Sequence, residues 1–470
     1  MVKSNSMKCF LAFALYFFPF ILYSQAISQK LQKALQQFEN DSQLKHAISS
    51  LYVIDAATGQ VVFDKNSQVG LAPASTQKII TAATAFELLG KDYRYKTVFT
   101  SEHGEVTGAK LVIFGSGDPT FGSWRFNSTI DSLILNNLFN GVKKMNYSSF
   151  DDVAWYNSGD SKYIPSGWIF EDIGNYYGAA SYDLNWHENQ YDIHFIPGKK
   201  VGDAAQLSNY TELLKRWKYV RNECKTGIIG SGDNAYVYLN PTKKEILIQG
   251  TIPMGVAKFT ISGADINPTA SFPFLCIEYL KSKGIDFVKE VAEHHEYNKE
   301  WNNMIKSHSF YTHYSPSLDS IIYWFLKKSI NLYGEALIKT FAYEKQGFGS
   351  TDSGVANVKK FWKAKGLDED ELNIYDGSGL SPLNRITTHA QVEILKYAKT
   401  KNWFPYFYDA LPEYNGMKMK SGTISDVKGF CGYQKSKKGK EYIFSFLVNN
   451  YSGKTSGVVS KMYRVLDELK

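Results

Sequence analysis

Residues 73–90 read PASTQKIITAATAFELLG, and this stretch decides the fold. Proline near the start and glycine at the end of an alanine-rich apolar run predict a helix over 76–89, with Ser75 in its first turn. At positions i and i+3 the side chains of Ser75 and Lys78 share a helix face, so the amine can reach the hydroxyl and activate it as a nucleophile. Taken alone, the pattern arises by chance in many long chains and favours a helix-start serine with a surface lysine.

Two further motifs lie downstream in the chain. Ser329-Ile330-Asn331 follows a helical apolar run, and Lys420-Ser421-Gly422-Thr423 precedes a pair of terminal strands. Each has a plain interpretation, as a helix cap or a strand-end turn. Together, and in this order, S-x-x-K, S-x-N and K-S-G match the signature of penicillin-binding proteins and class A β-lactamases. The three motifs therefore favour an acyl-transfer site over three unrelated turns.

On these motifs the chain resembles the D-alanyl-D-alanine carboxypeptidase/endopeptidases of the low-molecular-mass class C penicillin-binding proteins, which are similar to penicillin-binding protein 4 and form peptidase family S13. The resemblance extends to Gly115-Ser116-Gly117-Asp118-Pro119-Thr120 and Asp376-Gly377-Ser378-Gly379-Leu380-Ser381, and covers nearly all of the chain after residue 26. The long interval between Ser75 and Ser329 separates it from β-lactamases, where the first two motifs lie much closer together.

The resemblance implies an α+β fold in which a five-stranded antiparallel sheet is flanked by helices. This serine D,D-peptidase domain would be discontinuous, built from residues 27–95 and 296–470. Residues 96–295 would form an inserted, mostly β region of two domains, one nested in the other. The sequence agrees, because residues 51–64 read as a hairpin, residues 110–114, 191–196 and 245–248 alternate like strands, and a helical period returns over 318–343.

The resemblance also implies a role for each motif residue. Ser75 would be the acylated nucleophile and Lys78 its general base. Ser329 would pass a proton toward the leaving amine, and Asn331 would hydrogen-bond the penultimate amide of the substrate. Lys420 would hold positive charge near the terminal carboxylate of the substrate.

The remaining predicted site residues bind substrate. Ser421 and Thr423 would offer hydroxyls to the terminal carboxylate, Gly422 lies between them, and the backbone N–H groups of Ser75 and Thr423 would form the oxyanion hole. Asp172, in the inserted region, would contact the ammonium group of a diaminopimelyl side chain. The alternative for Asp172 is an ordinary exposed loop aspartate.

Some positions depart from the family pattern. Ile330 replaces the usual aspartate of the second motif, and Ser421 replaces the usual threonine but keeps the hydroxyl. Pro382 stands where relatives commonly carry arginine, and the nearby Arg385 is the candidate replacement. Activity is still expected, because the functional groups of the three motifs survive.

Composition limits the remaining functions. The chain has 470 residues, 44% of them hydrophobic, with a net charge of +7 that is too mild and dispersed for nucleic-acid binding.

Residues 1–26 read as an export signal, with Lys3 and Lys8 before an apolar stretch and Ser24-Gln25-Ala26 as the cleavage site. This signal predicts a periplasmic protein; an uncleaved anchor is the alternative.

The cysteines that remain after the predicted signal are Cys224, Cys276 and Cys431, an odd number without zinc-site spacing. Buried structural thiols are expected rather than a disulfide, and no metal or cofactor is expected.

The sequence therefore predicts an exported serine D,D-peptidase that hydrolyses D-Ala-D-Ala and cross-bridges of peptidoglycan stem peptides and binds β-lactams. Two alternatives stay open: a β-lactamase or esterase with the same nucleophile, and a non-catalytic peptidoglycan-binding scaffold.

Overall fold

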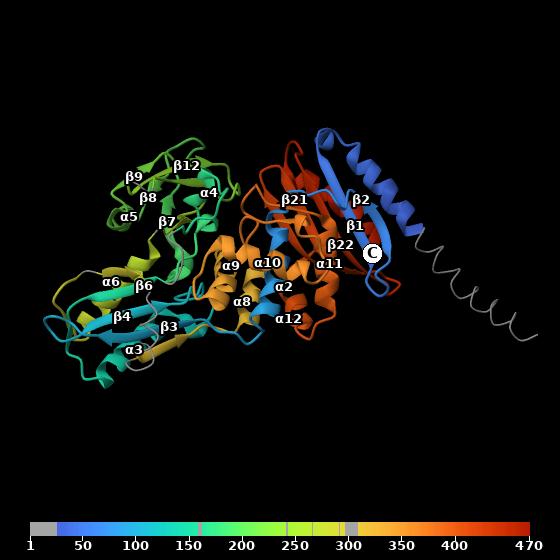
Figure 1. Ribbon diagram of the computed structural model, residues 1–470. Helices are drawn as coiled ribbons and strands as arrows, with labels where there is room; N and C mark the ends of the chain where they lie inside the picture. The colour runs from blue at the N-terminus through green and yellow to red at the C-terminus, as the bar shows by residue number, and fades with distance from the viewer. Residues whose placement is uncertain (1–25, 158–161, 241–242, 266, 291, 297–308) are drawn as a thin grey trace, which may run out of the picture. The chain divides into compact units, whose positions relative to one another are not determined.

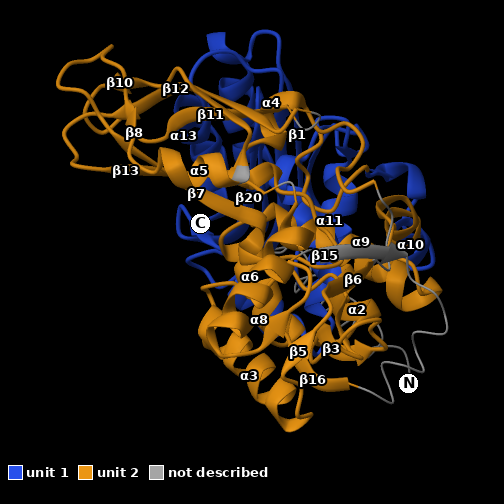
Figure 2. Ribbon diagram, turned by 90° about the vertical axis from the view of Figure 1, so that its left-hand side faces the viewer, with its two compact units in different colours: residues 1–83, 359–374, 382–470 blue, residues 84–358, 375–381 orange. Residues whose placement is uncertain are grey.

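The computed structural model describes residues 26–157, 162–240, 243–265, 267–290, 292–296 and 309–470. The predicted export signal lies outside the described residues, apart from its last residue. The chain divides into two compact units, shown in Figure 2. Unit 1 contains residues 1–83, 359–374 and 382–470, and unit 2 contains residues 84–358 and 375–381. Each unit is described by itself.

An antiparallel sheet of six strands organises unit 1, in the order β19-β20-β21-β22-β1-β2. Its strands are β1 Ile48–Asp55, β2 Val61–Lys65, β19 Glu413–Tyr414, β20 Met417–Ile424, β21 Val427–Lys435 and β22 Glu441–Asn449. The predicted hairpin pairs β1 with β2, and β1 also pairs with β22, so chain segments almost 400 residues apart form neighbouring strands (Figure 1). The predicted sheet had five strands; the sixth, β19, covers two residues at the edge.

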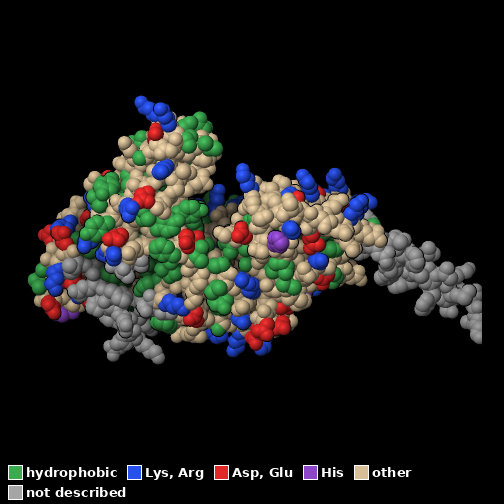
Figure 3. Space-filling view, turned by 90° about the horizontal axis from the view of Figure 1, so that it is seen from above, with side chains coloured by type: hydrophobic (Ala, Val, Ile, Leu, Met, Phe, Trp, Pro, Cys, Tyr) green, Lys and Arg blue, Asp and Glu red, His purple; other side chains and the backbone are tan. Residues whose placement is uncertain are grey.

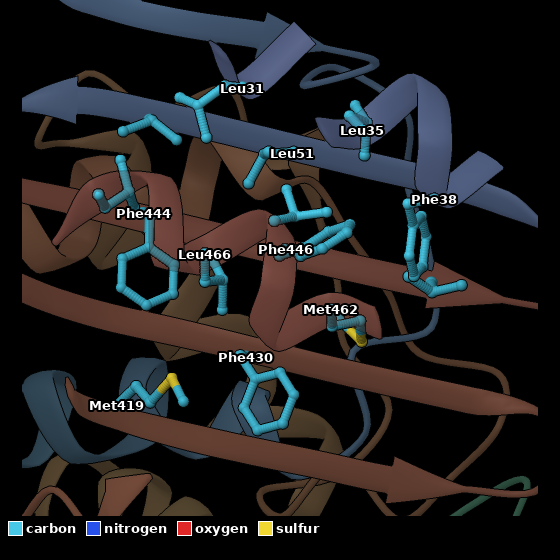
Figure 4. Close-up of a cluster of buried hydrophobic side chains, with 14 of the residues drawn as sticks. Leu31, Leu35, Phe38, Leu51, Met419, Phe430, Phe444, Phe446, Met462 and Leu466 are labelled. Atoms are coloured by element: carbon cyan, nitrogen blue, oxygen red, sulfur yellow. The ribbon is translucent and has the colours of Figure 1, made fainter. Parts of the chain in front are cut away.

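Helices cover both faces of this sheet. On one face, the helix at residues 26–39 and α13 (Thr455–Leu466) pack on the strands through the buried side chains shown in Figure 4. On the other face lie α11 (Thr388–Lys399) and the short 3₁₀ turn η2 (Ala74–Gln77). Burial of each large apolar side chain contributes about 1.5–3 kcal/mol. These helices therefore hold the sheet that positions η2.

Unit 2 contains three larger sheets. Their orders are β15-β6-β4-β3-β16; β10-β12-β11 with β9 also paired to β12; and β13-β7-β8. The strands of these sheets are β3 Lys96–Glu102, β4 Lys110–Gly115, β6 Val153–Asn157, β7 Gln190–Ile196, β8 Gln206–Leu207, β9 Tyr219–Asn222, β10 Lys225–Gly227, β11 Asn234–Asn240, β12 Glu245–Pro253, β13 Phe259–Ala264, β15 Ala292–Glu296 and β16 Ser309–Tyr314. β5 Ser149–Phe150 and β14 Asp286–Phe287 pair with each other in a separate two-stranded sheet.

The inserted region contains more helix than its strand-like sequence suggested. α3 (Asp131–Lys144) and α6 (Pro268–Ser282) contribute to one hydrophobic core with the five-stranded sheet. Ile134, Leu138 and Val142 are buried at four-residue intervals, which makes the apolar stripe of an amphipathic helix. The sequence interpretation concentrated on the alternating segments and passed over this stripe.

The predicted helical stretch 318–343 is two helices, α8 (Leu318–Lys327) and α9 (Asn331–Gln346). They are separated at Ser329, whose φ of 58° is incompatible with a continuous right-handed helix. The other helices are α2 Lys78–Leu88, α4 Phe170–Ile173, α5 Tyr210–Arg216, α10 Thr351–Lys363 and α12 Phe404–Ala410.

The described residues were expected to hold no membrane-spanning helix and no concentrated patch of basic side chains. In the described part of the chain, every helix is too short or too polar to cross a bilayer. On the face shown in Figure 3, basic and acidic side chains are interspersed rather than gathered by sign. This distribution fits the mild net charge.

Candidate active site

Ser75 and Lys78 lie at the junction of η2 and α2. The sequence placed the helix start at Thr76, whereas residues 74–77 form a 3₁₀ turn and the α-helix begins at Lys78. Lys78 Nζ donates a hydrogen bond to Ser75 Oγ at 2.8 Å. The Lys78 side chain is fully buried, while Ser75 is partly exposed. The arrangement presents a partly exposed hydroxyl with the Lys78 amine directly behind it.

A chain of buried hydrogen bonds connects the η2 turn to α11 and β22. Ser445 Oγ on β22 donates to Gln391 Oε1 on α11 at 2.6 Å, and Gln391 Nε2 donates to Thr76 Oγ1 at 2.9 Å. Thr76 Oγ1 in turn donates to the Pro73 carbonyl at 2.6 Å. Thr76, Gln391 and Ser445 are fully buried. Because unmade hydrogen bonds in a buried site are costly, this chain holds the residues on both sides of Ser75 in one geometry.

Two paired glycines allow β20 and β21 to approach the same turn. Gly422 and Gly429 lie opposite each other in the register of these strands. A Cβ atom on Gly422 would lie 2.6 Å from the Pro73 carbonyl oxygen and 2.8 Å from the backbone nitrogen of Ser75. A Cβ atom on Gly429 would lie 3.0 Å from a methyl carbon of Thr76. Gly422 therefore brings the third motif against the nucleophile turn, and Gly429 is a partner that the motif analysis missed.

Lys420 lies on β20, two residues before Gly422. It is only 1% exposed, and its Nζ donates to the Ser421 carbonyl at 2.8 Å. Burial lowers the pKa of Lys420 to about 7; the nearby Lys428 lowers it further, and the Cys431 thiol opposes the shift. A lysine with this pKa is partly neutral at neutral pH, so its charge responds to small changes in its surroundings.

The sequence analysis assigned no role to Lys428, although it contacts the third motif. Lys428 lies on β21 directly opposite Thr423, and its Nζ donates to Thr423 Oγ1 at 2.8 Å. Burial lowers the pKa of Lys428 to about 8. The lysine follows the motif by only five residues, but its alignment with Thr423 depends on the turn and register of two strands.

The candidate replacement for the family arginine, Arg385, is exposed and bound to its own loop. Its guanidinium donates to the carbonyls of Pro382 and Asn384 at 2.5 and 2.7 Å. Both bonds come from Nη1, so they tie one end of the guanidinium to its own loop, and Nε and Nη2 carry the three other N–H groups.

Ser329 and Asn331 belong to unit 2, and they lie at the break between α8 and α9. Ser329 is partly exposed and occupies the left-handed region of φ, an unusual conformation for serine that clusters at functional sites. Asn331 is the first residue of α9, and its Nδ2 donates to the Tyr177 carbonyl at 2.7 Å. The break therefore presents a hydroxyl and an amide two residues apart, with the amide orientation fixed by Tyr177.

Asp172 lies on α4 of unit 2 and is half-buried. Burial raises its pKa to about 6, the neighbouring Glu171 raises it further, and a hydrogen bond with Tyr177 opposes the shift. Tyr177 thus contacts both Asp172, through its side chain, and Asn331, through its carbonyl. No sequence pattern connected these residues.

The Asp376–Ser381 segment, which carried part of the resemblance, is a loop held by its own aspartate. The buried Asp376 carboxylate accepts hydrogen bonds from the backbone nitrogens of Gly379 at 2.8 Å and Ser381 at 2.6 Å, and from Trp168 Nε1 at 3.0 Å. Glu335 on α9 accepts from the Gly377 nitrogen. Within unit 2, these bonds make the Asp376 carboxylate the group that holds the loop in its conformation.

The three cysteines beyond the predicted signal, Cys224, Cys276 and Cys431, are free and buried, which confirms that they are structural thiols. Across the described residues, no cluster of three or more histidine, cysteine, aspartate or glutamate side chains could hold a metal ion.

Comparisons with known proteins agree with this arrangement. A D-alanyl-D-alanine carboxypeptidase from Actinomadura sp. (strain R39) is 27% identical over 461 residues, which cover 90% of this chain and 82% of the relative. The D-alanyl-D-alanine carboxypeptidase DacB of Haemophilus influenzae is 23% identical, with 86% and 85% of the two chains covered. The crystal structure of penicillin-binding protein 4 (dacB) from H. influenzae matches with a TM-score of 0.75 at 18% identity, covering 94% of this chain and 98% of that one.

The structural match shows that the chain has the penicillin-binding protein 4 fold, as the sequence predicted. The model of the D-Ala-D-Ala carboxypeptidase 3 (S13) family matches residues 31–413, which include the first two motifs and the whole of residues 96–295. The chain therefore belongs to the D-Ala-D-Ala carboxypeptidase 3 (S13) family of serine peptidases.

Proposed function

We propose that this protein is an exported serine D,D-peptidase that removes the terminal D-alanine from peptidoglycan stem peptides. The observation that carries the proposal is the 2.8 Å contact between Lys78 Nζ and Ser75 Oγ, with the lysine fully buried and the serine partly exposed. A serine hydroxyl needs an adjacent base to become a nucleophile, and this geometry supplies one. Family membership supports the same reaction.

In the proposed reaction, unprotonated Lys78 takes the proton of Ser75 as Oγ attacks the carbonyl carbon of the penultimate D-alanine. The resulting oxyanion is bound by the backbone N–H groups of Ser75 and Thr423. The tetrahedral intermediate collapses, the C–N bond breaks, and the leaving D-alanine receives a proton through Ser329. Water then attacks the Ser75 ester with the same base, which releases the shortened peptide and restores the hydroxyl.

The other predicted residues bind the substrate in this proposal. Asn331 hydrogen-bonds the penultimate amide, and the hydroxyls of Ser421 and Thr423 bind the terminal carboxylate near the positive charge of Lys420. Asp172 pairs with the side-chain ammonium of the stem peptide. The pKa of Asp172, about 6, leaves it mostly ionised at neutral pH, as this role requires.

The proposal includes cleavage of cross-bridges. An amide between D-alanine and the side-chain amine of a neighbouring stem peptide presents the same carbonyl, so the same acyl-enzyme would form with a different leaving amine. The charged start, apolar stretch and cleavage site of residues 1–26 support export to the compartment that holds this substrate.

Incubation with a stem pentapeptide that ends in D-Ala-D-Ala tests the proposal. The protein should release free D-alanine, and Ser75→Ala should release none. Ser456→Ala, at an exposed serine on α13, is the matched control and should keep full activity. A scaffold would bind the peptide without releasing D-alanine. A β-lactamase would hydrolyse a chromogenic cephalosporin rapidly and leave no lasting adduct, and either result would contradict the proposal.

A further inference from the structure

Lys428 is a nearly buried cation without an acidic partner. It is 7% exposed, and its Nζ contacts Thr423 Oγ1 at 2.8 Å and lies 4.7 Å from the centre of the Phe430 ring. Among the described residues, no carboxylate lies within ion-pair distance of it. An ammonium group removed from water without an anion is costly, so buried charges are ordinarily paired or serve a ligand.

The register of the sheet places this ammonium next to Thr423, the last residue of the third motif. Thr423 on β20 and Lys428 on β21 lie directly opposite each other, so their side chains share one face of the sheet. Phe430, two residues further along β21, lies on the same face, and Figure 4 shows its ring among the buried side chains. Thr423 itself is exposed. The hydroxyl thus faces solvent while the lysine supports it from below.

The hydrogen bonding leaves this pair with free capacity for an anion. Lys428 donates one of its three N–H groups to Thr423 Oγ1, and the Thr423 O–H can therefore donate outward. The pKa of Lys428, about 8, keeps the amine mostly protonated at neutral pH. By contrast, Lys420 has a pKa of about 7 and already donates to the Ser421 carbonyl.

The neighbouring edge of β20 lacks a partner strand near Thr423. β19 pairs with β20 only at Met417 and Lys418, and the Met419 nitrogen donates to the Pro412 carbonyl, so within the described residues no strand pairs with this edge from Lys420 to Ile424. A peptide that lies along this edge with its end near Thr423 would bring its terminal carboxylate to the hydroxyl and to the ammonium behind it.

We propose that Lys428 is a specificity-determining residue that, together with Thr423, binds the C-terminal carboxylate of the substrate. The inference rests on the proposed D,D-peptidase function and adds to it a second cation that the motifs do not contain. The carboxylate supplies the anion that the buried ammonium lacks. It also accepts a charge-assisted hydrogen bond from Lys428, which is stronger than a hydrogen bond between neutral groups.

A pair of peptides that differ only at the C-terminus tests the inference. The unaltered protein should hydrolyse a stem peptide with a free carboxylate faster than the same peptide with a C-terminal amide. Lys428→Met should lower kcat/KM on the carboxylate peptide by about tenfold to a hundredfold, mainly through KM, and change kcat/KM on the amide by less than about twofold. Lys428→Arg should restore the preference for the carboxylate.

Lys435→Met is the matched control, because Lys435 lies at the exposed end of the same strand; it should leave both peptides unaffected. If Lys428→Met does not fold, Lys428→Gln replaces it in the same assay. Equal losses on both peptides, or no loss on either, would overturn the inference and show that the lysine only supports the strand.

A binding measurement separates this inference from the proposed function. Calorimetric titration with the dipeptide D-Ala-D-Ala needs no catalysis, and the affinity should fall by about tenfold or more in Lys428→Met. If the unaltered protein hydrolyses neither peptide, the proposed function fails, while the dipeptide affinity still decides the role of Lys428. An unchanged dipeptide affinity in the variant would overturn that role.

Discussion

Replacement of Gly422 by alanine is expected to slow acylation of Ser75 without unfolding the protein. The added Cβ would lie 2.6 Å from the Pro73 carbonyl oxygen and 2.8 Å from the backbone nitrogens of Ser75 and Thr76. Ordinary contacts begin near 3.4 Å, and all three atoms are backbone, so the strand or the turn must shift by about 0.6–0.8 Å. Because misplacement by about 1 Å can cost about a hundredfold in rate, acylation should fall by about tenfold to a hundredfold.

The assay is the rate of benzylpenicillin adduct formation, followed by intact-protein mass spectrometry, together with thermal unfolding. Gly70→Ala is the control, since a Cβ there would meet its nearest neighbour, the Cβ of Arg385, at an ordinary 3.4 Å. Gly422→Ala acylating within twofold of the unaltered protein would refute the argument that close approach of β20 fixes the nucleophile turn. A loss of folding in Gly422→Ala, with Gly70→Ala intact, would assign the glycine to stability instead.

Four further outcomes follow from the same geometry. Lys78→Ala should slow acylation by about a hundredfold or more, the scale of a positioned general base, and stopped-flow acylation rates measure it. Gln391→Leu should lower the free energy of unfolding by about 1–3 kcal/mol in denaturant titrations, because the buried Ser445 hydroxyl loses its acceptor and Thr76 Oγ1 loses its donor, and it should also slow acylation. Asp172→Asn should reduce kcat/KM on peptides with a free side-chain amine and not on acetylated ones, and in the unaltered protein this preference should fade as pH drops through about 6, where Asp172 takes up a proton. In pH–rate profiles, kcat/KM on carboxylate peptides should fall as pH rises through about 7 and then about 8, since Lys420 and then Lys428 lose their charges there while burial keeps the neighbouring Cys431 a neutral thiol.

Local sequence patterns predicted many of the helices and strands. Proline and glycine bounded the helix after Ser75, and the hairpin of β1 and β2 and the strands β21 and β22 followed from alternation and turn residues. Two features required tertiary context. The break at Ser329 interrupts an apolar helical period that continues on both sides, and the stripe on α3 lay in a region whose strands gave a stronger pattern.

The residues of the candidate site also divide into those that local motifs predicted and those that only tertiary contacts reveal. Motif spacing identified Ser75, Lys78 and the third motif, because those residues act on one turn or one strand. The residues that it missed act across long sequence intervals or across a strand register. Gln391 is 315 positions from Thr76, and Lys428 meets Thr423 only because β20 and β21 pair in one particular register.

The most direct test of the account is to locate the benzylpenicillin adduct. After labelling and proteolysis, peptide mass spectrometry should find the penicilloyl group on Ser75, and Ser75→Ala should carry no adduct. An adduct on any other residue, or an unaltered protein that takes up none, would contradict the assignment of Ser75 as the nucleophile.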